Sequence, residues 1–464
     1  MNIPQFLVAA PTSGAGKTTV SCGLMALLRS KNLQVQPYKC GPDYIDTKYH
    51  QRACGRPSIN LDRFMASDNH IRDLYARYSR GADICVVEGM MGMFDGYQRD
   101  RGSSADVARL LGLPVVMVVD ARSAAYSMAP LLSGFLHFSP DVQVAGVIFN
   151  KVGTERHRLM LSEVCEDLGM TCFGFVPRHE ELEQDSRYLG LDFSQPHNLG
   201  GELLSLLEEN IDWRLMLERT SRPQPEATAE PTAPTPADKD GEPCGQVLDS
   251  GCGLPPLLNI LVARNDESFS FIYQEHLDLL AQWGDVTYFD PEVDELIPTN
   301  IDLLYLPGGY PEKHAGALSR ARHTRSSIRN YIARGGRTLA ECGGMIYLSQ
   351  DILFDDMTPD HGLREPMARA LPFSISCMKA HRRLSLGYRQ FTYAGQLFKG
   401  HEFHYTQLLP PEDNDQLPPS VTQVLNARGG TVNTPVFRHK NTLASYTHLY
   451  WGESDILRIF DTEK

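Results

Sequence analysis

Short apolar runs alternate with longer amphipathic stretches through the first 215 residues of the chain. This alternation predicts parallel strands joined by helices, because a strand buried on both faces reads as a continuous apolar run. The expected strands are 5–10, 35–39, 84–88, 115–120, 144–150 and 171–176, and the expected helices are 17–30, 123–136 and 155–168. The first region is therefore expected to be an α/β domain whose mostly parallel sheet is covered on both faces.

A second alternating pattern occupies residues 257–464. It predicts strands at 258–263, 286–289 and 303–306, helices at 269–283 and 319–334, and a more β-rich pattern after about residue 370. Residues 216–256 differ from both regions, since they are rich in proline, alanine and threonine and poor in large apolar side chains. Such a segment cannot build a core and predicts a linker. The expected domains are thus 1–215 and 257–464, joined by 216–256.

Composition narrows the functional classes. The 464-residue chain carries a formal net charge of -13, which argues against general binding to nucleic acid or to membrane surfaces. No apolar run is long enough to span a bilayer and the N-terminus lacks a secretory signal pattern, so a cytoplasmic location is expected. None of the ten cysteines forms a CxxC pair. We expect most of them to be buried thiols, with Cys342 as the exception.

A phosphate-binding loop follows the first predicted strand. Its sequence departs from the strict pattern only in having Pro11 where the first glycine would stand. Small residues let backbone N–H groups surround phosphate oxygens, Lys17 supplies a charge for the β- and γ-phosphates, and Thr18 can bind Mg²⁺. The predicted ATP-binding residues are Ser13, Gly14, Ala15, Gly16, Lys17, Thr18, Thr19 and Asn150. Asn150 ends a strand and is a candidate for hydrogen bonding to adenine.

Carboxylates at neighbouring strand ends complete the expected nucleotide site. The carboxyl ends of parallel strands meet at one edge of a sheet, so Asp46 and Glu88 are expected to join Thr18 in holding Mg²⁺. Lys39, Asp43 and Asp95 are further candidates for substrate or metal binding.

A second reactive site is predicted around Cys342. The sequence runs from a strand into Cys342-Gly343-Gly344 and then a helix, a turn that exposes the sulfur near a helix N-terminus. Gly308 and Gly309 follow another strand and, with Gly343, are the predicted oxyanion-stabilising residues. His448 is the candidate general base. His401-Glu402-Phe403-His404 does not match the HExxH zinc pattern, so we expect it to have a structural role or to contact substrate.

A phosphate loop and a reactive thiol in one chain indicate a glutamine-dependent amide synthase. One site would activate a carboxylate as an acyl phosphate and the other would release ammonia. The alternative from a different class is a P-loop ATPase switch that carries an inactive amidotransferase tail, which predicts ATP turnover without glutaminase activity.

Six motifs together resemble the cobyrinic acid a,c-diamide synthase family, and the resemblance covers nearly the whole chain. They begin at Thr12, Lys39, Val87, Pro307, Ala340 and Gly400 and read TSGAGKT, KCGPDYID, VEGMMGMFDG, PGGYPE, AECGG and GHEFHY. The resemblance implies a dethiobiotin synthetase-like P-loop domain and a flavodoxin-like class I glutamine amidotransferase domain. It also implies ATP- and glutamine-dependent amidation of the a and c acetate groups of a corrin acid in cobalamin biosynthesis, with Mg²⁺ as cofactor.

The resemblance leaves several points open. Most class I amidotransferases carry a glutamate two residues after the histidine, whereas Tyr450 stands there in this chain, as in the family named above. A Cys342–His448 dyad is therefore expected, and Glu453 is one acid that could orient the imidazole. The substrate could be cobyrinic acid, hydrogenobyrinic acid or a nickel sirohydrochlorin, and the KCGPDYID segment argues against cobyric acid synthase. Arg187, Arg382 and Arg383 are candidates for contacting the macrocycle carboxylates. A homodimer is compatible with the sequence, which does not set the oligomeric state.

Overall fold

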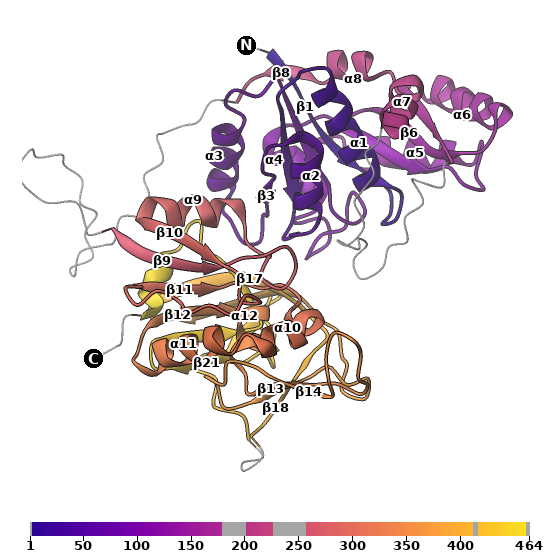
Figure 1. Ribbon diagram of the computed structural model, residues 1–464. Coiled ribbons are helices and arrows are strands. Elements are labelled where there is room, and N and C mark those ends of the chain that lie inside the picture. Colours follow the sequence, from indigo (N-terminus) through magenta and orange to yellow (C-terminus); the bar gives the residue numbers. More distant parts are fainter. Residues whose placement is uncertain (1, 179–200, 226–256, 412–415, 461–464) are drawn as a thin grey trace, which may run out of the picture. The chain divides into compact units, whose positions relative to one another are not determined.

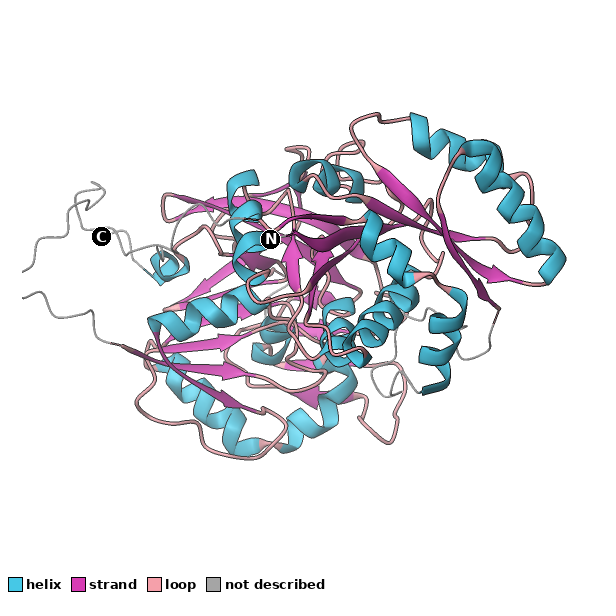
Figure 2. Cartoon of the chain, turned by 90° about the horizontal axis from the view of Figure 1, so that it is seen from above, coloured by secondary structure: helices cyan, strands magenta, loops and turns pink. Residues whose placement is uncertain are grey.

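The structure is a computed structural model that describes residues 2–178, 201–225, 257–411 and 416–460. The chain forms two compact units whose boundary, between residues 230 and 231, lies outside the described residues. Each unit is built on its own parallel sheet with flanking helices (Figures 1 and 2). Among the described residues, no helix combines the length and apolarity required to cross a membrane.

The first unit contains an eight-stranded sheet in the order β3-β2-β4-β1-β5-β6-β7, with β8 pairing to β1. All neighbouring pairs on the main path are parallel, which confirms the α/β prediction. The strands are β1 (Asn2–Ala9), β2 (Val35–Cys40), β3 (Ile59–Leu61), β4 (Ile84–Glu88), β5 (Val115–Asp120), β6 (Val144–Val152) and β7 (Cys172–Pro177). The flanking helices are α1 (Lys17–Ser30), α2 (Asp46–Cys54), α3 (Asp68–Tyr78), α4 (Ser104–Leu111), α5 (Met128–His137), α6 (Glu155–Leu168) and α7 (Gly201–Asn210).

The first unit extends beyond residue 215, so the predicted start of the linker at 216 is wrong. Helix α8 (Trp213–Arg219) buries Met216 completely, and β8 (Ser221–Pro223) pairs antiparallel with the first residues of β1. The Gln5 side chain also donates hydrogen bonds to the carbonyls of Arg222 and Pro223. Backbone pairing and one buried methionine thus fold a segment whose composition alone resembles the linker. The expected linker residues 226–256 lie outside the described residues.

The second unit has a six-stranded sheet in the order β10-β9-β11-β12-β22-β21, parallel except for β21. Its strands are β9 (Leu258–Ala263), β10 (Gly284–Phe289), β11 (Leu303–Leu306), β12 (Arg337–Glu341), β21 (Val436–His439) and β22 (Thr442–Ser445). The accompanying helices are α9 (Gln274–Trp283), η2 (Pro311–His314), α10 (Ala315–Arg320), α11 (Arg322–Ala333), α12 (Gly343–Leu348) and η3 (Ile456–Phe460).

Two smaller sheets follow. Most of their strands lie after residue 370, as the β-rich pattern predicted, but the first two lie before it. One has the order β14-β13-β15-β18 and the other β20-β19-β16-β17-β23. Their strands are β13 (Asp351–Leu353), β14 (Arg364–Pro366), β15 (Ser374–Ser376), β16 (Ser385–Tyr393), β17 (Gln396–His404), β18 (Gln407–Leu409), β19 (Val424–Asn426), β20 (Thr431–Val432) and β23 (His448–Tyr450).

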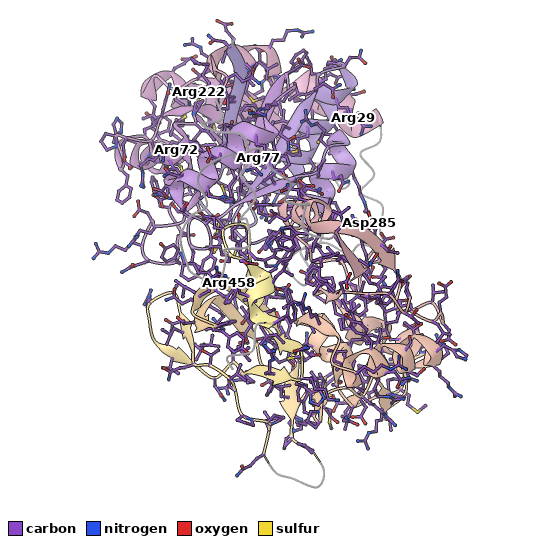
Figure 3. All side chains as sticks on the ribbon, turned by 90° about the vertical axis from the view of Figure 1, so that its left-hand side faces the viewer. Arg29, Arg72, Arg77, Arg222, Asp285 and Arg458 are labelled. Carbon is purple, nitrogen blue, oxygen red and sulfur yellow. The ribbon has the colours of Figure 1, made fainter. Side chains whose placement is uncertain are left out.

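Side-chain alternation explains how the second sheet is buried on both faces. Leu261 and Leu304 join one apolar cluster, whereas their chain neighbours Ile260 and Leu303 join another. Charged side chains instead lie on outer surfaces: Arg72 of α3 is exposed, and so is Asp285 of β10 (Figure 3). The charged groups that are buried are therefore notable, and several gather at the ends of the central strands.

Three predicted helices begin or end elsewhere. The helix predicted from residue 123 begins at Met128, and Ser123 itself has φ 60°, outside helical geometry. The helix predicted from residue 269 begins at Gln274, because the N–H groups of Ser270 and Phe271 donate to the Gly308 carbonyl. The helix predicted at 319–334 is two helices, α10 and α11, that meet at Ala321.

Candidate active sites

The phosphate loop joins β1 to α1 in a conformation that requires glycine. Gly14 and Gly16 have φ values of 78° and 94°, which side chains with a Cβ adopt with strain. A Cβ at Gly16 would also lie 2.2 Å from Nδ2 of Asn150. That Nδ2 donates to the Ala15 carbonyl at 2.9 Å, so the end of β6 holds the loop in place.

Asn150 has a structural role that its position in the sequence did not indicate. Both ends of its buried amide are bonded, because Oδ1 also accepts from the Lys151 N–H at 2.9 Å. These bonds shape the phosphate loop, and contact with adenine stays a prediction.

Lys17 and Thr18 begin α1 and lie close to the end of β4. The Lys17 ammonium donates to the Met91 carbonyl at 2.5 Å, and the Thr18 hydroxyl donates to Oε1 of Glu88 at 2.7 Å. Asp46 also lies 3.5 Å from the Thr18 hydroxyl. Three of the predicted residues from separate elements, Thr18, Asp46 and Glu88, are thus brought together as expected for strand ends at one sheet edge.

Lys39 lies between the two carboxylates. Its Nζ is 2.5 Å from Oδ2 of Asp46 and 3.0 Å from Oε1 of Glu88, and its side chain is only 4% exposed. Asp43 lies farther from Lys39, with 3.9 Å between its Oδ2 and Nζ, and its Oδ1 accepts from the N–H groups of Ile45 and Asp46 at the start of α2. Asp95 is exposed and accepts from the Gly92 N–H at 3.0 Å.

A buried histidine that the sequence reasoning missed supports this cluster. Nε2 of His50 is 2.7 Å from Oε2 of Glu88, and Nδ1 is 2.9 Å from the Ser58 hydroxyl. His50 lies four residues after Asp46 on α2, so the i,i+4 spacing put both side chains on one helix face. That spacing was the available signal.

The charges of this cluster offset one another. Burial alone would raise the pKa of Glu88, but Lys39 and His50 hold it well below its usual range. Burial and then Lys39 lower the pKa of Lys17 to about 8, so a bound polyphosphate would favour its charged form.

The oxygen donors of Thr18, Asp46 and Glu88 fit Mg²⁺, which prefers oxygen ligands and commonly uses one or two carboxylates beside substrate phosphates. Among the described residues there is no cluster of three or more histidine, cysteine or carboxylate side chains suited to a metal.

Cys342 occupies a strained turn between β12 and α12. Its φ of 45° is unusual for a residue with a Cβ, and such strain is typical of functional turns. Only glycine fits at position 344, because a Cβ there would lie 2.0 Å from the Leu306 carbonyl oxygen. The Cys342 N–H donates to the Ser445 carbonyl at 2.7 Å, which ties the turn to the end of β22. The predicted strand–turn–helix geometry is therefore present, but the predicted exposure of the sulfur is wrong: Cys342 is buried and only 3% exposed, like most of the other cysteines.

The glycine turn after β11 packs against Gly343, which follows Cys342, and against the His448 ring. A Cβ on Gly343 would lie 2.9 Å from the Gly309 N, and a Cβ on Gly308 would lie 2.1 Å from Cε1 of the His448 ring. The His448 ring stacks on His401 with centroids 5.0 Å apart and planes 15° apart. The fold thus gathers the predicted nucleophile, glycine turn and base in one place.

The thiol and the imidazole are both uncharged near neutral pH. Burial, followed by the Glu312 and Glu402 carboxylates, raises the pKa of Cys342 well above its usual value. Burial and then His404 lower the pKa of His448 to about 3. A neutral imidazole is able to accept the thiol proton during attack. Tyr450, which stands where many amidotransferases have an acid, donates to Oε2 of Glu275 at 2.5 Å, and Glu453 is exposed.

The His401-Glu402-Phe403-His404 segment forms β17 beside this site. Glu402 is 1% exposed and pairs with Nε of Arg389 at 2.6 Å and Nε2 of His404 at 2.7 Å. It also accepts from the hydroxyls of Ser385 and Thr434. His404 stacks on Tyr446 at 3.5 Å between centroids. These contacts make Glu402 a paired structural charge, consistent with the prediction for this segment. The candidate arginines Arg382 and Arg383 are exposed, and Arg187 lies outside the described residues.

These features define a two-domain protein, a P-loop nucleotide-binding domain followed by a glutamine amidotransferase-type domain. Residues 6–190 match the CobQ/CobB/MinD/ParA nucleotide binding domain, and residues 259–456 match the CobB/CobQ-like glutamine amidotransferase domain.

Full-length relatives refine that class. The chain is 36% identical to cobyrinate a,c-diamide synthase of Caldanaerobacter subterraneus, over 98% of this chain and 97% of that protein. It is 37% identical to the enzyme of the same name from Gloeobacter violaceus, over 96% and 94%. Hydrogenobyrinate a,c-diamide synthase of Brucella abortus is 35% identical, over 96% and 98%. The chain belongs to the cobyrinate a,c-diamide synthase family, and it is accordingly an amide-forming ligase of cobalamin biosynthesis.

Proposed function

We propose that this protein uses ATP and glutamine to convert the a and c acetate carboxylates of cobyrinic acid, or of cobalt-free hydrogenobyrinic acid, into amides. The observation that carries this proposal is that one chain holds both a phosphate loop beside Asp46 and Glu88 and a cysteine turn that shares its glycine neighbours with His448. Relatives of both names are similar at nearly equal identity, so the proposal includes both macrocycles.

At the first site, Lys17 and the phosphate loop hold the polyphosphate of ATP, with Lys39 adding positive charge. A substrate carboxylate oxygen attacks the γ-phosphorus, and the bond from that phosphorus to ADP breaks. The products are ADP and an acyl phosphate. Thr18, Asp46 and Glu88 would hold Mg²⁺, which neutralises phosphate charge when bound.

At the second site, the Cys342 sulfur attacks the side-chain amide of glutamine while His448 takes the thiol proton. The N–H groups near Gly308, Gly309 and Gly343 stabilise the oxyanion. His448 then gives its proton to the leaving nitrogen, which departs as ammonia and leaves a thioester. Water hydrolyses the thioester to glutamate. Ammonia attacks the acyl phosphate, phosphate leaves, and an amide is formed; a second cycle amidates the other acetate.

The test measures products by mass spectrometry with each macrocycle, ATP, Mg²⁺ and either glutamine or ammonium. Cys342→Ala should lower glutamine-driven amidation about 10⁴-fold or more while ammonium-driven amidation persists. Lys17→Ala should lower amidation about 10²–10³-fold with either nitrogen source. Two carboxylate-to-amide changes are expected in the wild type. ATP turnover without glutaminase activity would instead favour the ATPase-switch alternative, and turnover only of a nickel sirohydrochlorin would replace the proposed substrate.

A further inference from the structure

The Glu341 side chain contacts two of the three segments that meet at the thiol site, and its own backbone belongs to the third. It is the last residue of β12, directly before Cys342, and is 2% exposed. Its Oε1 accepts from the Leu449 N–H at 3.1 Å, and its Oε2 accepts from the Tyr305 hydroxyl at 2.8 Å.

Each partner of Glu341 lies next to a group with a proposed chemical role. Leu449 directly follows His448 in β23. Tyr305 lies in β11, two residues before Pro307 and the glycine turn that begins there. One carboxyl group therefore connects the segments that carry the nucleophile, the base and the oxyanion turn.

This connection crosses between two sheets. Strand β12 pairs with β11 and β22, whereas β23 pairs with β17 in the other sheet. Backbone pairing thus sets Cys342 relative to the glycine turn, but it does not directly join β12 to β23. A side-chain bond between those two strands can set the separation of base and nucleophile, and a displacement of about 1 Å can cost about 10²-fold in rate.

We propose that Glu341 is a positioning residue that holds the His448 strand against the nucleophile elbow and the glycine turn. This inference rests on the proposed roles of Cys342 and His448. Glu341 acts through hydrogen bonds and not through its charge. Burial supports this, since it raises the pKa of Glu341 to about 8 and so favours the uncharged acid at neutral pH.

The bonding pattern predicts that glutamine can replace Glu341. An amide oxygen can accept from the Leu449 N–H, while the amide NH₂ can donate to the Tyr305 oxygen. Alanine can do neither and leaves the Leu449 N–H without this acceptor. The pair Glu341→Gln and Glu341→Ala thus separates loss of charge from loss of the connection.

The experiment compares glutaminase kcat, KM for glutamine and ammonium-driven amidation in the full-length enzyme. For Glu341→Ala we expect kcat to fall about 10²-fold, with KM changed by less than about 3-fold. For Glu341→Gln we expect kcat within about 3-fold of wild type. Ammonium-driven amidation should be unchanged in both. Glu295→Gln, at an exposed acid elsewhere in the second unit, is the matched control and should behave as wild type.

Two results would overturn the inference: wild-type kcat in Glu341→Ala, or an equal loss in Glu341→Gln. If Glu341→Ala does not fold, Tyr305→Phe takes its place, with an expected fall of about 3–10-fold in glutaminase kcat and intact ammonium-driven amidation. An unchanged kcat in Tyr305→Phe would then count against the inference. Cys342→Ala distinguishes failure of the proposed function from failure of this inference. If Cys342→Ala keeps glutaminase activity, the proposed function is wrong. If Cys342→Ala loses that activity but Glu341→Ala keeps it, only the role of Glu341 is wrong.

Discussion

The two sites differ in whether their candidate functional side chains carry charge while buried. In the first unit, several side chains predicted to meet ligands are buried and ionisable: Lys39 is held between Asp46 and Glu88, where burial raises the pKa of Asp46 while Lys39 and His50 hold that of Glu88 well below its usual range. In the second unit, Cys342 and His448 are uncharged, and the buried ion pair of Glu402 with Arg389 involves neither of them. A site for polyphosphate needs fixed charge, whereas the proposed proton transfer begins from a neutral thiol and a neutral imidazole.

Removing the central cation should break the first site most severely. In Lys39→Met, Glu88 loses the ammonium that compensates its buried charge, and such a loss costs about 3–5 kcal/mol. Amide hydrogen exchange in β2 and β4 should report this local destabilisation, while glutaminase activity should be kept. Adding Glu88→Gln should recover part of the stability without recovering ATP-dependent amidation. Unaltered exchange in the single variant would contradict this description of the site.

The Glu402 ion pair should make the second unit sensitive to acid. The pKa of Glu402 is lowered to about 2, because the contacts with His404 and the hydroxyl groups outweigh the opposing effect of burial. A depressed carboxyl pKa gives stability that is complete above the unfolded value of about 4.5 and is lost as pH falls toward 2. The contribution is on the order of 3 kcal/mol.

Unfolding measured between pH 6 and 3 tests this prediction. Stability of the wild-type second unit should fall with acidity, and Glu402→Gln should have a flatter acid-side slope with lower stability at pH 6. Hydrogen exchange in β16 and β17 assigns the change to this unit. Identical slopes in the two proteins would show that Glu402 is not the responsible group.

The smallest of these effects is expected at His50, which forms a buried hydrogen bond with Oε2 of Glu88. His50→Asn removes the 2.7 Å contact to Oε2 while leaving the Lys39 and Thr18 contacts in place. Loss of such an outer contact typically lowers activity about 10–100-fold, here in ATP-dependent amidation with ammonium. The exposed His137→Asn is the matched control. Equal activity in both variants would mean that Glu88 needs no support from His50.

The sequence predicted local features well, but it predicted contacts between distant segments of the chain poorly. The strand-to-turn transitions at Gly16 and Cys342 were recognisable because glycine and small residues mark turns that a bulky side chain would block. The start of α9 was misplaced because the N–H groups of Ser270 and Phe271 bond the Gly308 turn, 37 or more residues away. Residues 216–223 were assigned to the linker because their pairing partner, β1, lies at the other end of the domain.

The sequence by itself determined that the chain has two α/β domains with largely parallel sheets, and it named the candidate residues for phosphate binding and for nucleophilic attack. Those properties depend on side-chain chemistry and on spacing along a single strand, turn or helix. Only the tertiary structure decided that Lys39 lies between two carboxylates, that Asn150 bonds the phosphate loop, and that Glu341 reaches both Tyr305 and Leu449. Each of these contacts joins residues of separate elements, and their distances are set by how the sheets pack and not by any local pattern.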